Sequence, residues 1–378
     1  MPPIEDCGPS PATKLRKLDT TQQNPVNLKL LGVDIVLPKQ IASHEHLSSF
    51  PERPRELPAT IPDHFVKDTL AELNTHPRDR NISFQADDHV YFWKGKRVSK
   101  SVTQLVHKFT APFCEEQVIS SMRESCNWPR PGYLKTTLSE SQKNKLQKIP
   151  GGKELLAELQ RPERDELKVC RLAFKLRANH ASNPDKDADI ACALTELGLS
   201  REEIIHKWEK ARQDGAKEGT WMHAQFQWLL NGGSVPAKTT EVFLLSQFLR
   251  LQANTKAFRT EWQVYADSED LAGSIDYVAK RPDGSVIIVD WKRTSPHRLQ
   301  RQTCNKFMRT PLSHVPDCTL WHYRLQLNVY KFILEQYYGE AVSDMYIVGT
   351  NPEYRDQPFI DNVPTMDVET KTLLANVR

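Results

Sequence analysis

The sequence predicts an α/β fold in which a mixed β-sheet is flanked by helices and preceded by an N-terminal hairpin and a helical insertion. Three strand-like segments follow one another closely at 258–265, 273–280 and 285–292. Helical patterns lie on both sides of them, and a short apolar strand is expected at 345–349. The order helix, strand, hairpin, helix, strand is typical of an α/β sandwich.

The composition is that of a globular chain with a very polar surface. Of 378 residues, 39% are hydrophobic and 26% are charged, which is compatible with a packed core. The formal net charge is only +3. Binding to nucleic acid must therefore be argued from local clusters of basic residues rather than from the whole chain.

Three regions are expected along the chain. Residues 1–62 are rich in Pro, Ser, Thr and Gln without periodicity, which predicts a disordered N-terminal arm. Residues 63–200 are expected to form an N-terminal hairpin and a helical lobe, packed as a lid or a partly separate unit. Residues 201–378 are expected to form the sheet domain. We assign no chemistry to residues 127–200.

The N-terminal region carries local signals of its elements. Residues 89–98 read as a hairpin around Lys94-Gly95-Lys96. Ser101 and Gln104 have the spacing of a capping box at the start of a helix. Further helical patterns cover 152–159 and 163–178.

The sheet domain has equally local start and stop signals. Ser200 and Glu203 have capping-box spacing, and a helix is expected to end at Asn231-Gly232-Gly233. Other helices are predicted at 241–256, 319–338 and 366–376.

The second and third strands form a hairpin that carries two acids. The turn at 281–284 contains Pro282 and Gly284, which suit a tight reversal. Because residues two apart share a strand face, Asp290 and Lys292 point to the same side. A three-residue loop places Asp276 directly opposite Asp290, whereas a change of one residue makes them diagonal neighbours.

The carboxylates of Asp276 and Asp290 are expected to repel each other unless a positive charge lies between them. They approach within roughly 5–8 Å in an apolar sheet. At about 5 Å and an effective dielectric of 20, their repulsion is roughly 3 kcal/mol. A divalent cation such as Mg²⁺, or Mn²⁺, would relieve it, because such ions prefer oxygen ligands. The alternatives are that both acids lie solvated at strand ends and that Lys292 simply forms a salt bridge with one of them.

These residue types suit hydrolysis of a phosphodiester. The reaction develops negative charge on the phosphate oxygens and on the leaving oxygen, and metal ions neutralise it and lower the pKa of water. Lys292 is expected to position that water or stabilise the charge, with a pKa that partial desolvation lowers.

A family resemblance adds to this interpretation. Gly273-Ser-Ile-Asp276 followed by Ile287-Ile-Val-Asp290-Trp-Lys292 resembles the D…(D/E)-x-K signature of PD-(D/E)XK nucleases. Gly219-Thr-Trp-Met-His223 is similar to the GTxxH helix of the RecB-like branch, and Gln326-Leu-Asn-Val-Tyr330 to its Q-L-x-x-Y helix. Ser101-Val-Thr-Gln-Leu105 is similar to the S-V-T-x-L segment of the mitochondrial genome-maintenance exonuclease group.

The resemblance implies a role for each matching residue. The implied catalytic residues are Asp276, Asp290, Lys292, His223, Gln326 and Tyr330. The implied metal ligands are Asp276, Asp290 and the main-chain carbonyl of Trp291, with His223 and Glu261 as additional candidates. Ordinary alternatives stay open: a structural His223, a packing face for Gln326 and Tyr330, and an outward-facing, solvated Glu261.

The segment after the hairpin is basic. Between residues 291 and 310 it has six basic residues and no acid, with His297 and Phe307 interleaved. A solvated basic surface is the default interpretation, but beside a metal hairpin we favour a phosphate-binding track with little sequence specificity. The residues expected to contact DNA are Arg293, Arg298, Arg301, Lys306 and Arg309.

The expected activity is a Mg-dependent deoxyribonuclease. The resembled branch implies an exonuclease, or an end- or flap-processing enzyme, acting on free or single-stranded DNA ends in DNA repair or recombination. The alternatives are an endonuclease on the same core, a catalytically inactive DNA-binding scaffold, and an unrelated α/β protein with a chance motif.

The spacing of the cysteines and the hydropathy of the chain bear on whether it is an iron–sulfur, membrane or secreted protein. None of the seven cysteines has C-x-x-C spacing, and Cys304 and Cys318 do not match the late cysteine cluster of iron–sulfur members of the branch, so we expect no iron–sulfur cluster. The sequence shows neither an apolar run of about 18 residues nor a secretory signal. We expect an intracellular monomer with no membrane partner; nucleus, cytoplasm and mitochondrion stay open.

Overall fold

The computed structural model describes residues 28–30, 33–35, 50–58, 61, 68–86, 88–180, 184–235 and 239–377. Most of the predicted disordered arm, residues 1–62, lies outside this set. Across the described ranges, no helix combines the length and apolar character that a membrane span requires.

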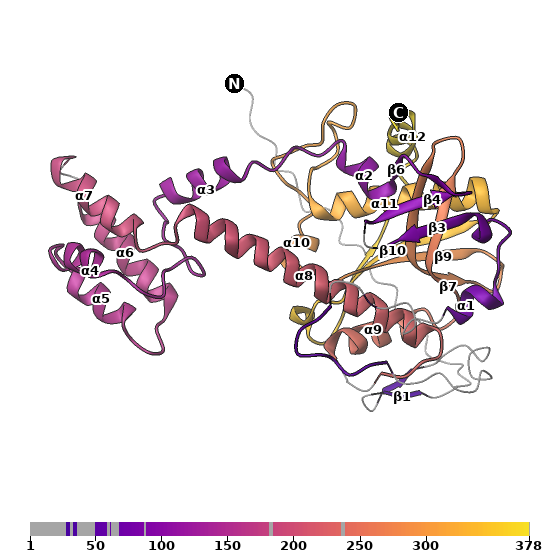
Figure 1. Ribbon diagram of the computed structural model, residues 1–378, viewed down its shortest axis with the longest axis horizontal. Helices are drawn as coiled ribbons and strands as arrows, with labels where there is room; N and C mark the ends of the chain where they lie inside the picture. Colours follow the sequence, from indigo (N-terminus) through magenta and orange to yellow (C-terminus); the bar gives the residue numbers. More distant parts are fainter. Residues whose placement is uncertain are drawn as a thin grey trace, which may run out of the picture.

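A six-stranded mixed sheet forms the centre of the molecule (Figure 1). The strand β9 pairs in parallel with β10 and antiparallel with β8. The strand β7 pairs antiparallel with β8, β11 pairs antiparallel with β10, and β6 pairs in parallel with β8. The strands are β6 (Lys100–Ser101), β7 (Lys256–Ala266), β8 (Leu271–Lys280), β9 (Val286–Lys292), β10 (Val342–Gly349) and β11 (Phe359–Asn362). The predicted mixed α/β sheet is confirmed.

The sheet forks along one edge of β8. The strand β7 pairs with β8 from Leu271 to Lys280 and occupies its other edge. On the forked edge, pairing with β9 ends at Tyr277, and β6 pairs only with Leu271 and Ala272. Residues 273–276 therefore lie where β9 has separated from β8, which leaves room for side chains between the two strands.

Helices cover both faces of the sheet. On one face, Val286 and Ile288 of β9 pack in the same core as Leu325 and Val329. This face is covered by α2 (Val102–His107), α11 (Thr319–Ile333), its π-helical continuation η3 (Leu334–Tyr338) and α12 (Asp367–Ala375). The short α10 (Pro296–Leu299) precedes α11.

The opposite face is packed by different helices. Ile287, Val289 and Trp291 of β9 join a second core, which confirms the predicted alternation along this strand. Its helices are α1 (Thr69–Leu73), the C-terminal part of α8 (Arg201–Leu230) and α9 (Thr240–Leu251). The predicted helix 241–256 thus ends earlier, and β7 begins at Lys256.

The predicted N-terminal hairpin forms and belongs with the sheet domain. A small sheet of β3 (Ile82–Gln85), β4 (Val90–Trp93) and β5 (Lys96–Arg97) follows the short helix η2 (Asp79–Asn81). Trp93 stacks on Tyr265 of β7 with ring centroids 4.5 Å apart. Gly95 takes a left-handed φ of 75° in the turn.

A separate helical lobe extends from the sheet domain (Figure 1). It has its own core, which includes Leu146, Leu155, Val169 and Leu194. Its helices are α3 (Glu115–Glu124), α4 (Glu140–Gln147), α5 (Gly152–Leu159), α6 (Glu166–His180) and α7 (Pro184–Thr195). The predicted 63–200 unit therefore divides in two, because the hairpin, β6 and α2 pack with the sheet and only the later helices form the lobe.

The helix α8 connects the lobe to the sheet. Its start is stabilised by the predicted capping box of Ser200 and Glu203, and it ends before Asn231 as predicted. A helix of this length spans about 45 Å. Between residues 209 and 218 none of its side chains is buried, so the middle of α8 is a solvated spacer.

Part of the predicted disordered arm is ordered. The strands β1 (Leu28–Leu30) and β2 (Val33–Ile35) pair antiparallel. Phe50 is only 1% exposed and packs between Trp221 and Trp228, at centroid distances of 5.0 and 6.3 Å. Its N–H donates to the carbonyl of Ser234. The prediction of disorder is wrong at these positions.

Candidate metal centre

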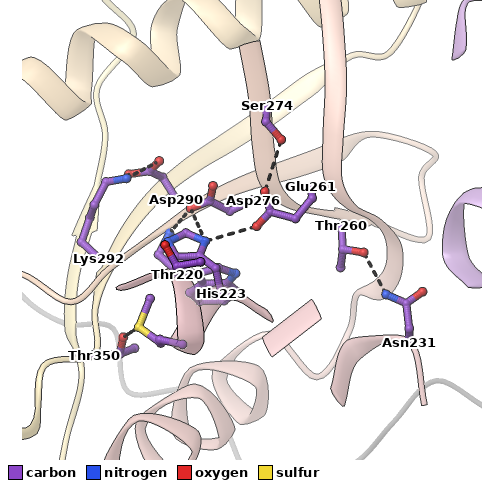
Figure 2. Close-up of polar contacts among 12 residues, drawn as sticks. Thr220, His223, Asn231, Thr260, Glu261, Ser274, Asp276, Asp290, Lys292 and Thr350 are labelled. Carbon is purple, nitrogen blue, oxygen red and sulfur yellow. Dashed lines mark hydrogen bonds and ion pairs between the residues drawn. The ribbon is translucent and has the colours of Figure 1, made fainter. Parts of the chain in front are cut away.

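Three acids lie level with one another on neighbouring strands. The pairs Thr260–Tyr277 and Trp262–Ile275 bracket Glu261 of β7 and Asp276 of β8. The β8–β9 pairing ends at Tyr277–Val289, one residue after Asp276 on β8 and one residue before Asp290 on β9. Asp276 lies between Glu261 and Asp290 in Figure 2. The sheet register thus collects three carboxylates at the fork.

His223 joins the acids from the helix α8. Its Nδ1 lies 3.2 Å from Oε1 of Glu261 and 3.7 Å from Oδ2 of Asp276. One ligand atom from each of His223, Glu261 and Asp276 lies within 4.8 Å of the other two. These three residues therefore form a set that could share one ion.

The backbone of Glu261 is strained. Its φ is +43°, a left-handed value that residues with a side chain rarely adopt. The side chain faces His223 and accepts a hydrogen bond from Ser274 Oγ at 3.3 Å. Glu261 thus points away from the core that contains Trp262 and Val264, as predicted, and toward the site rather than into open solvent. The hydroxyl of the neighbouring Thr260 accepts a hydrogen bond from the side chain of Asn231, directly after α8.

Asp290 forms a buried pair with Lys292. Nζ of Lys292 donates a 2.9 Å hydrogen bond to Oδ1 and lies 2.8 Å from Oδ2. Asp290 is 3% exposed. Its Oδ2 is buried and accepts no hydrogen bond from any residue that the structure describes. The predicted orientation of Asp290 and Lys292 toward one side is confirmed, and both carboxylate oxygens of Asp290 lie within 3 Å of the ammonium.

The pKa values reflect a crowded set of charges. Burial raises the pKa of Asp276 to about 7, against the opposing charge of His223. Burial lowers the pKa of His223, but the charges of Asp276 and Glu261 and the hydrogen bond to Glu261 raise it to about 9. In the metal-free site burial lowers the pKa of Lys292, but Asp290 and Asp276 outweigh burial and raise it above its usual value. The lowered pKa expected for a lysine beside a bound metal stays a prediction.

The donor set fits a hard divalent cation. Two carboxylates and one imidazole come within 4.8 Å of one another, and a buried oxygen of the neighbouring Asp290 lacks a hydrogen bond. Buried acids with raised pKa values gain most from added positive charge. Asp290 was predicted to bind the metal together with Asp276. Its ion pair with Lys292, at 2.8 Å, is shorter than the contacts of Glu261 and Asp276 with His223. Its role as a ligand stays a prediction.

The helix α11 lies on the face of the sheet opposite to the face that α8 covers. The side chain of Gln326 donates to the hydroxyl of Tyr330 at 3.2 Å. Tyr330 packs so closely on β8 that a Cβ at Gly273 would lie 2.5 Å from its ring. The charges of Asp290 and Asp276 add to burial in raising the pKa of Tyr330. Tyr330 therefore lies near the acids, and Gln326 is held against its hydroxyl.

Tyr323 was not predicted. Its ring lies 4.6 Å from Nζ of Lys292, and its hydroxyl lies 3.5 Å from Oγ1 of Thr294. The available signal was its spacing, since Tyr323 is three residues before Gln326 and therefore on the same helix face. Ser274, hydrogen-bonded to Glu261, had no comparable signal.

Trp291 contributes to the site through its backbone. Its main-chain N–H donates a 2.7 Å hydrogen bond to Oδ2 of Asp276. Its indole lies in the other core, against Phe226, Phe248 and Tyr277. The proposed use of its carbonyl as a metal ligand stays a prediction.

The predicted DNA contacts separate into two groups. Arg293 is ion-paired with Glu241 at 2.8 Å and lies 3.7 Å from Glu218, so its guanidinium is engaged within the protein. The other four are exposed, on a segment anchored by buried Leu299 and Met308. These four residues are Arg298, Arg301, Lys306 and Arg309.

The exposed basic segment begins close to the acids. Arg298 donates to Oγ1 of Thr319, in the first turn of α11, at 3.5 Å. Thr319 is one helical turn, or about 6 Å, before Tyr323. The segment therefore leads away from Lys292 along the N-terminal end of α11.

Comparison with known proteins adds no relative. No family model matches the chain, and no curated protein matches it.

Proposed function

We propose that this chain is a Mg²⁺-dependent DNA nuclease with a PD-(D/E)XK-type core, acting as an exonuclease or an end- or flap-processing enzyme. One observation carries the proposal: acids from three adjacent strands converge at a fork in the sheet, beside a buried lysine paired with one of them. A stable fold has little reason to gather these charges unless they bind a cation or a charged substrate.

Four residues would hold the cation. They are Glu261, Asp276 and His223, which lie within ligand range of one another, and Asp290, whose Oδ2 accepts no hydrogen bond but is ion-paired with Lys292. A bound Mg²⁺ or Mn²⁺ would neutralise charge on the phosphate and lower the pKa of the attacking water. The oxygen-rich set favours these ions over softer metals.

Lys292 would act as a protonated group. Its raised pKa keeps the ammonium charged at neutral pH, so it suits hydrogen-bond donation to a phosphate oxygen better than general-base catalysis. Asp290 and the ring of Tyr323 hold its position from two sides. Tyr330 and Gln326 would line the substrate side of the same acids.

The exposed basic residues would hold the DNA backbone. Arg298, Arg301, Lys306 and Arg309 lie on the segment that leads from Lys292 past the start of α11. Contacts to phosphates position a strand and carry no base code, so cleavage should show little sequence preference.

A cleavage assay tests the proposal. The purified chain is incubated with end-labelled linear DNA and with covalently closed circular DNA, in Mg²⁺ or in EDTA, with Asp290→Asn as the matched control. We expect Mg²⁺-dependent loss of the linear DNA alone. Opening of circles would indicate an endonuclease instead. Binding without cutting would indicate an inactive scaffold and would remove the catalytic assignment.

A further inference from the structure

A cavity of about 460 Å³ lies within the helical lobe. It is an open depression bordered by α3, α6, α7 and the first residue of α8. Its lining residues include Ile119, Ser120, Arg123, Arg177, Thr195 and Arg201. Clefts of about 300–1,000 Å³ are the usual size of small-molecule sites, so this cavity is large enough to hold a ligand of its own.

Two arginines in the cavity lack anionic partners. Neither Arg123 nor Arg177 forms an ion pair with any acid in the described part of the chain. The Nε atoms of both are buried and have no hydrogen-bond partner among the described residues. A buried N–H donor without a partner costs about 1–3 kcal/mol, so each guanidinium has unused capacity to bind an acceptor.

The position of Arg177 is fixed by its other nitrogens. Nη1 donates to the carbonyl of Ser125 at 3.1 Å and Nη2 to Oγ1 of Thr195 at 3.0 Å. Burial lowers the pKa of Arg177 below its usual value. The guanidinium is therefore held in place, partly desolvated and without a counter-charge.

The balance of charge in the lining is positive. Arg201 is ion-paired with Glu116, whereas Arg123 and Arg177 form no ion pair with a described acid, although Arg123 interacts electrostatically with the exposed Glu202. The lining contains one acid, the exposed Glu124. Two guanidiniums without an ion pair, beside the exposed carboxylates of Glu124 and Glu202, favour an anionic ligand.

We propose that this cavity binds a small phosphate monoester, with the phosphate held between Arg123 and Arg177. A phosphate monoester carries a charge of about −1.5 to −2 at neutral pH and offers three acceptor oxygens, and the guanidinium fork matches its geometry. The hydroxyl of Ser120 adds a donor. The side chains of Ile119 and Ala191 offer an apolar wall to the organic part of the ligand.

The site stands apart from the acid cluster. Arg201 and His223 are 22 residues apart on the continuous helix α8, or about 33 Å along its axis. The proposal therefore does not depend on nuclease activity, and its test can be made without metal.

Calorimetric titration of the full chain in EDTA tests it. The probes are inorganic phosphate, adenosine 5′-monophosphate, unphosphorylated adenosine and a single-stranded oligonucleotide with a 5′-hydroxyl end. The variants are Arg123→Ala, Arg177→Lys and the matched control Arg171→Ala, an exposed arginine on the same helix as Arg177. Arg123 makes no side-chain hydrogen bond to any described residue, so its removal should leave the fold intact.

We expect the parent and Arg171→Ala to bind the monophosphate and to ignore adenosine. Arg123→Ala and Arg177→Lys should each weaken that binding by about tenfold or more. Binding that is unchanged in Arg123→Ala, or no binding of phosphate and monophosphate by the parent, would overturn the proposal. Arg123-dependent binding of the oligonucleotide alone would also overturn it, because the ligand would then be a strand rather than a small monoester.

Discussion

The main-chain N–H of Trp291 donates a 2.7 Å hydrogen bond to Oδ2 of Asp276. This bond ties the carboxylate of β8 to the backbone between Asp290 and Lys292 on β9, at the point where the two strands stop pairing. The carboxylate of Asp276 thus takes the place of a backbone carbonyl as the acceptor for this N–H between β8 and β9. The bond fixes the orientation of Asp276, and the same Oδ2 lies 3.7 Å from Nδ1 of His223.

Variants of the Asp290–Lys292 pair should affect folding stability and DNA cleavage differently. Asp290→Asn leaves a buried ammonium without its carboxylate, and breaking such a pair costs about 3 kcal/mol. The double variant Asp290→Asn/Lys292→Met removes both charges and should recover most of that loss, yet neither variant should cleave DNA. Urea denaturation and the cleavage assay measure the two effects. A double variant no more stable than the single one would show that the two charges are not coupled.

His223 predicts how the stability of the metal-free chain depends on pH. Its folded-state pKa, about 9, lies above its ordinary value of 6.5. The stabilisation from protonated His223 is therefore complete below about pH 6.5 and is lost as the pH rises through about 9. Its size is about 2 kcal/mol after allowance for solvent screening.

Denaturation in EDTA at pH 6 and pH 9.5 measures this effect, with His223→Gln as the neutral control. The parent should lose more stability than the variant over this interval. The raised pKa of Asp276 acts in the same direction but at lower pH, with stability lost as the pH rises from about 4 toward 7. Equal losses in parent and variant would contradict the charged pairing of His223.

Local sequence signals predicted the elements that carry the acids. The alternation of residues 286–292 and the Pro–Gly turn set the register that brings Asp276 level with Asp290, and the structure has that register. The capping boxes at Ser101 and Ser200 are also present. Each of these features depends on residues close together in the chain, which is why sequence reasoning found them.

The remaining features depend on distant residues. The fork exists because the two-residue strand β6 pairs beside β8, and so short a strand has no pattern of its own. Arg293 was expected to bind DNA, but Glu241, 52 residues away, pairs with it. The length of α8 was not predicted, because its solvated middle has no apolar stripe to join the start at Ser200 to the end at Asn231.

Tyr323 is predicted to position Lys292. Its ring lies 4.6 Å from the ammonium, and such a contact contributes about 0.5–2 kcal/mol. Tyr323→Leu should therefore lower kcat by about 2- to 30-fold with little change in KM. Tyr323→Phe retains the ring and should stay near the parent value. Equal loss in both variants would point to the hydroxyl instead, and would remove the ring from this role.

The exposed basic segment predicts a change in salt dependence. Arg298→Ala and Arg301→Ala should each weaken DNA binding and reduce the slope of log K against log salt by about 1. Binding is measured by fluorescence anisotropy in EDTA, so that no cleavage intervenes. Lys371→Ala, exposed on α12, is the control and should leave the slope unchanged. Unchanged slopes in both arginine variants would remove them from the DNA track.

Alanine variants at Gly219 and Gly215 distinguish an effect on substrate access from an effect on folding stability. A Cβ at Gly219 or at Gly215 would meet no atom within 4 Å. Replacing glycine by alanine inside a helix stabilises it by about 1 kcal/mol, so both Gly219→Ala and Gly215→Ala should raise the stability of the chain. Both positions lie on the stripe of α8 that leads to His223, because each is a multiple of four residues before it.

The two variants should differ in activity. Gly219 is one turn from His223, so its new methyl group would project into the space beside the acids, where a phosphate must approach. Gly215 is a further turn away. We expect Gly219→Ala to lose cleavage at least tenfold while gaining stability, and Gly215→Ala to gain stability with activity unchanged. If both variants cleave DNA at the parent rate, the substrate does not pass over this face of α8, and the acids must be reached from the α11 side of the fork.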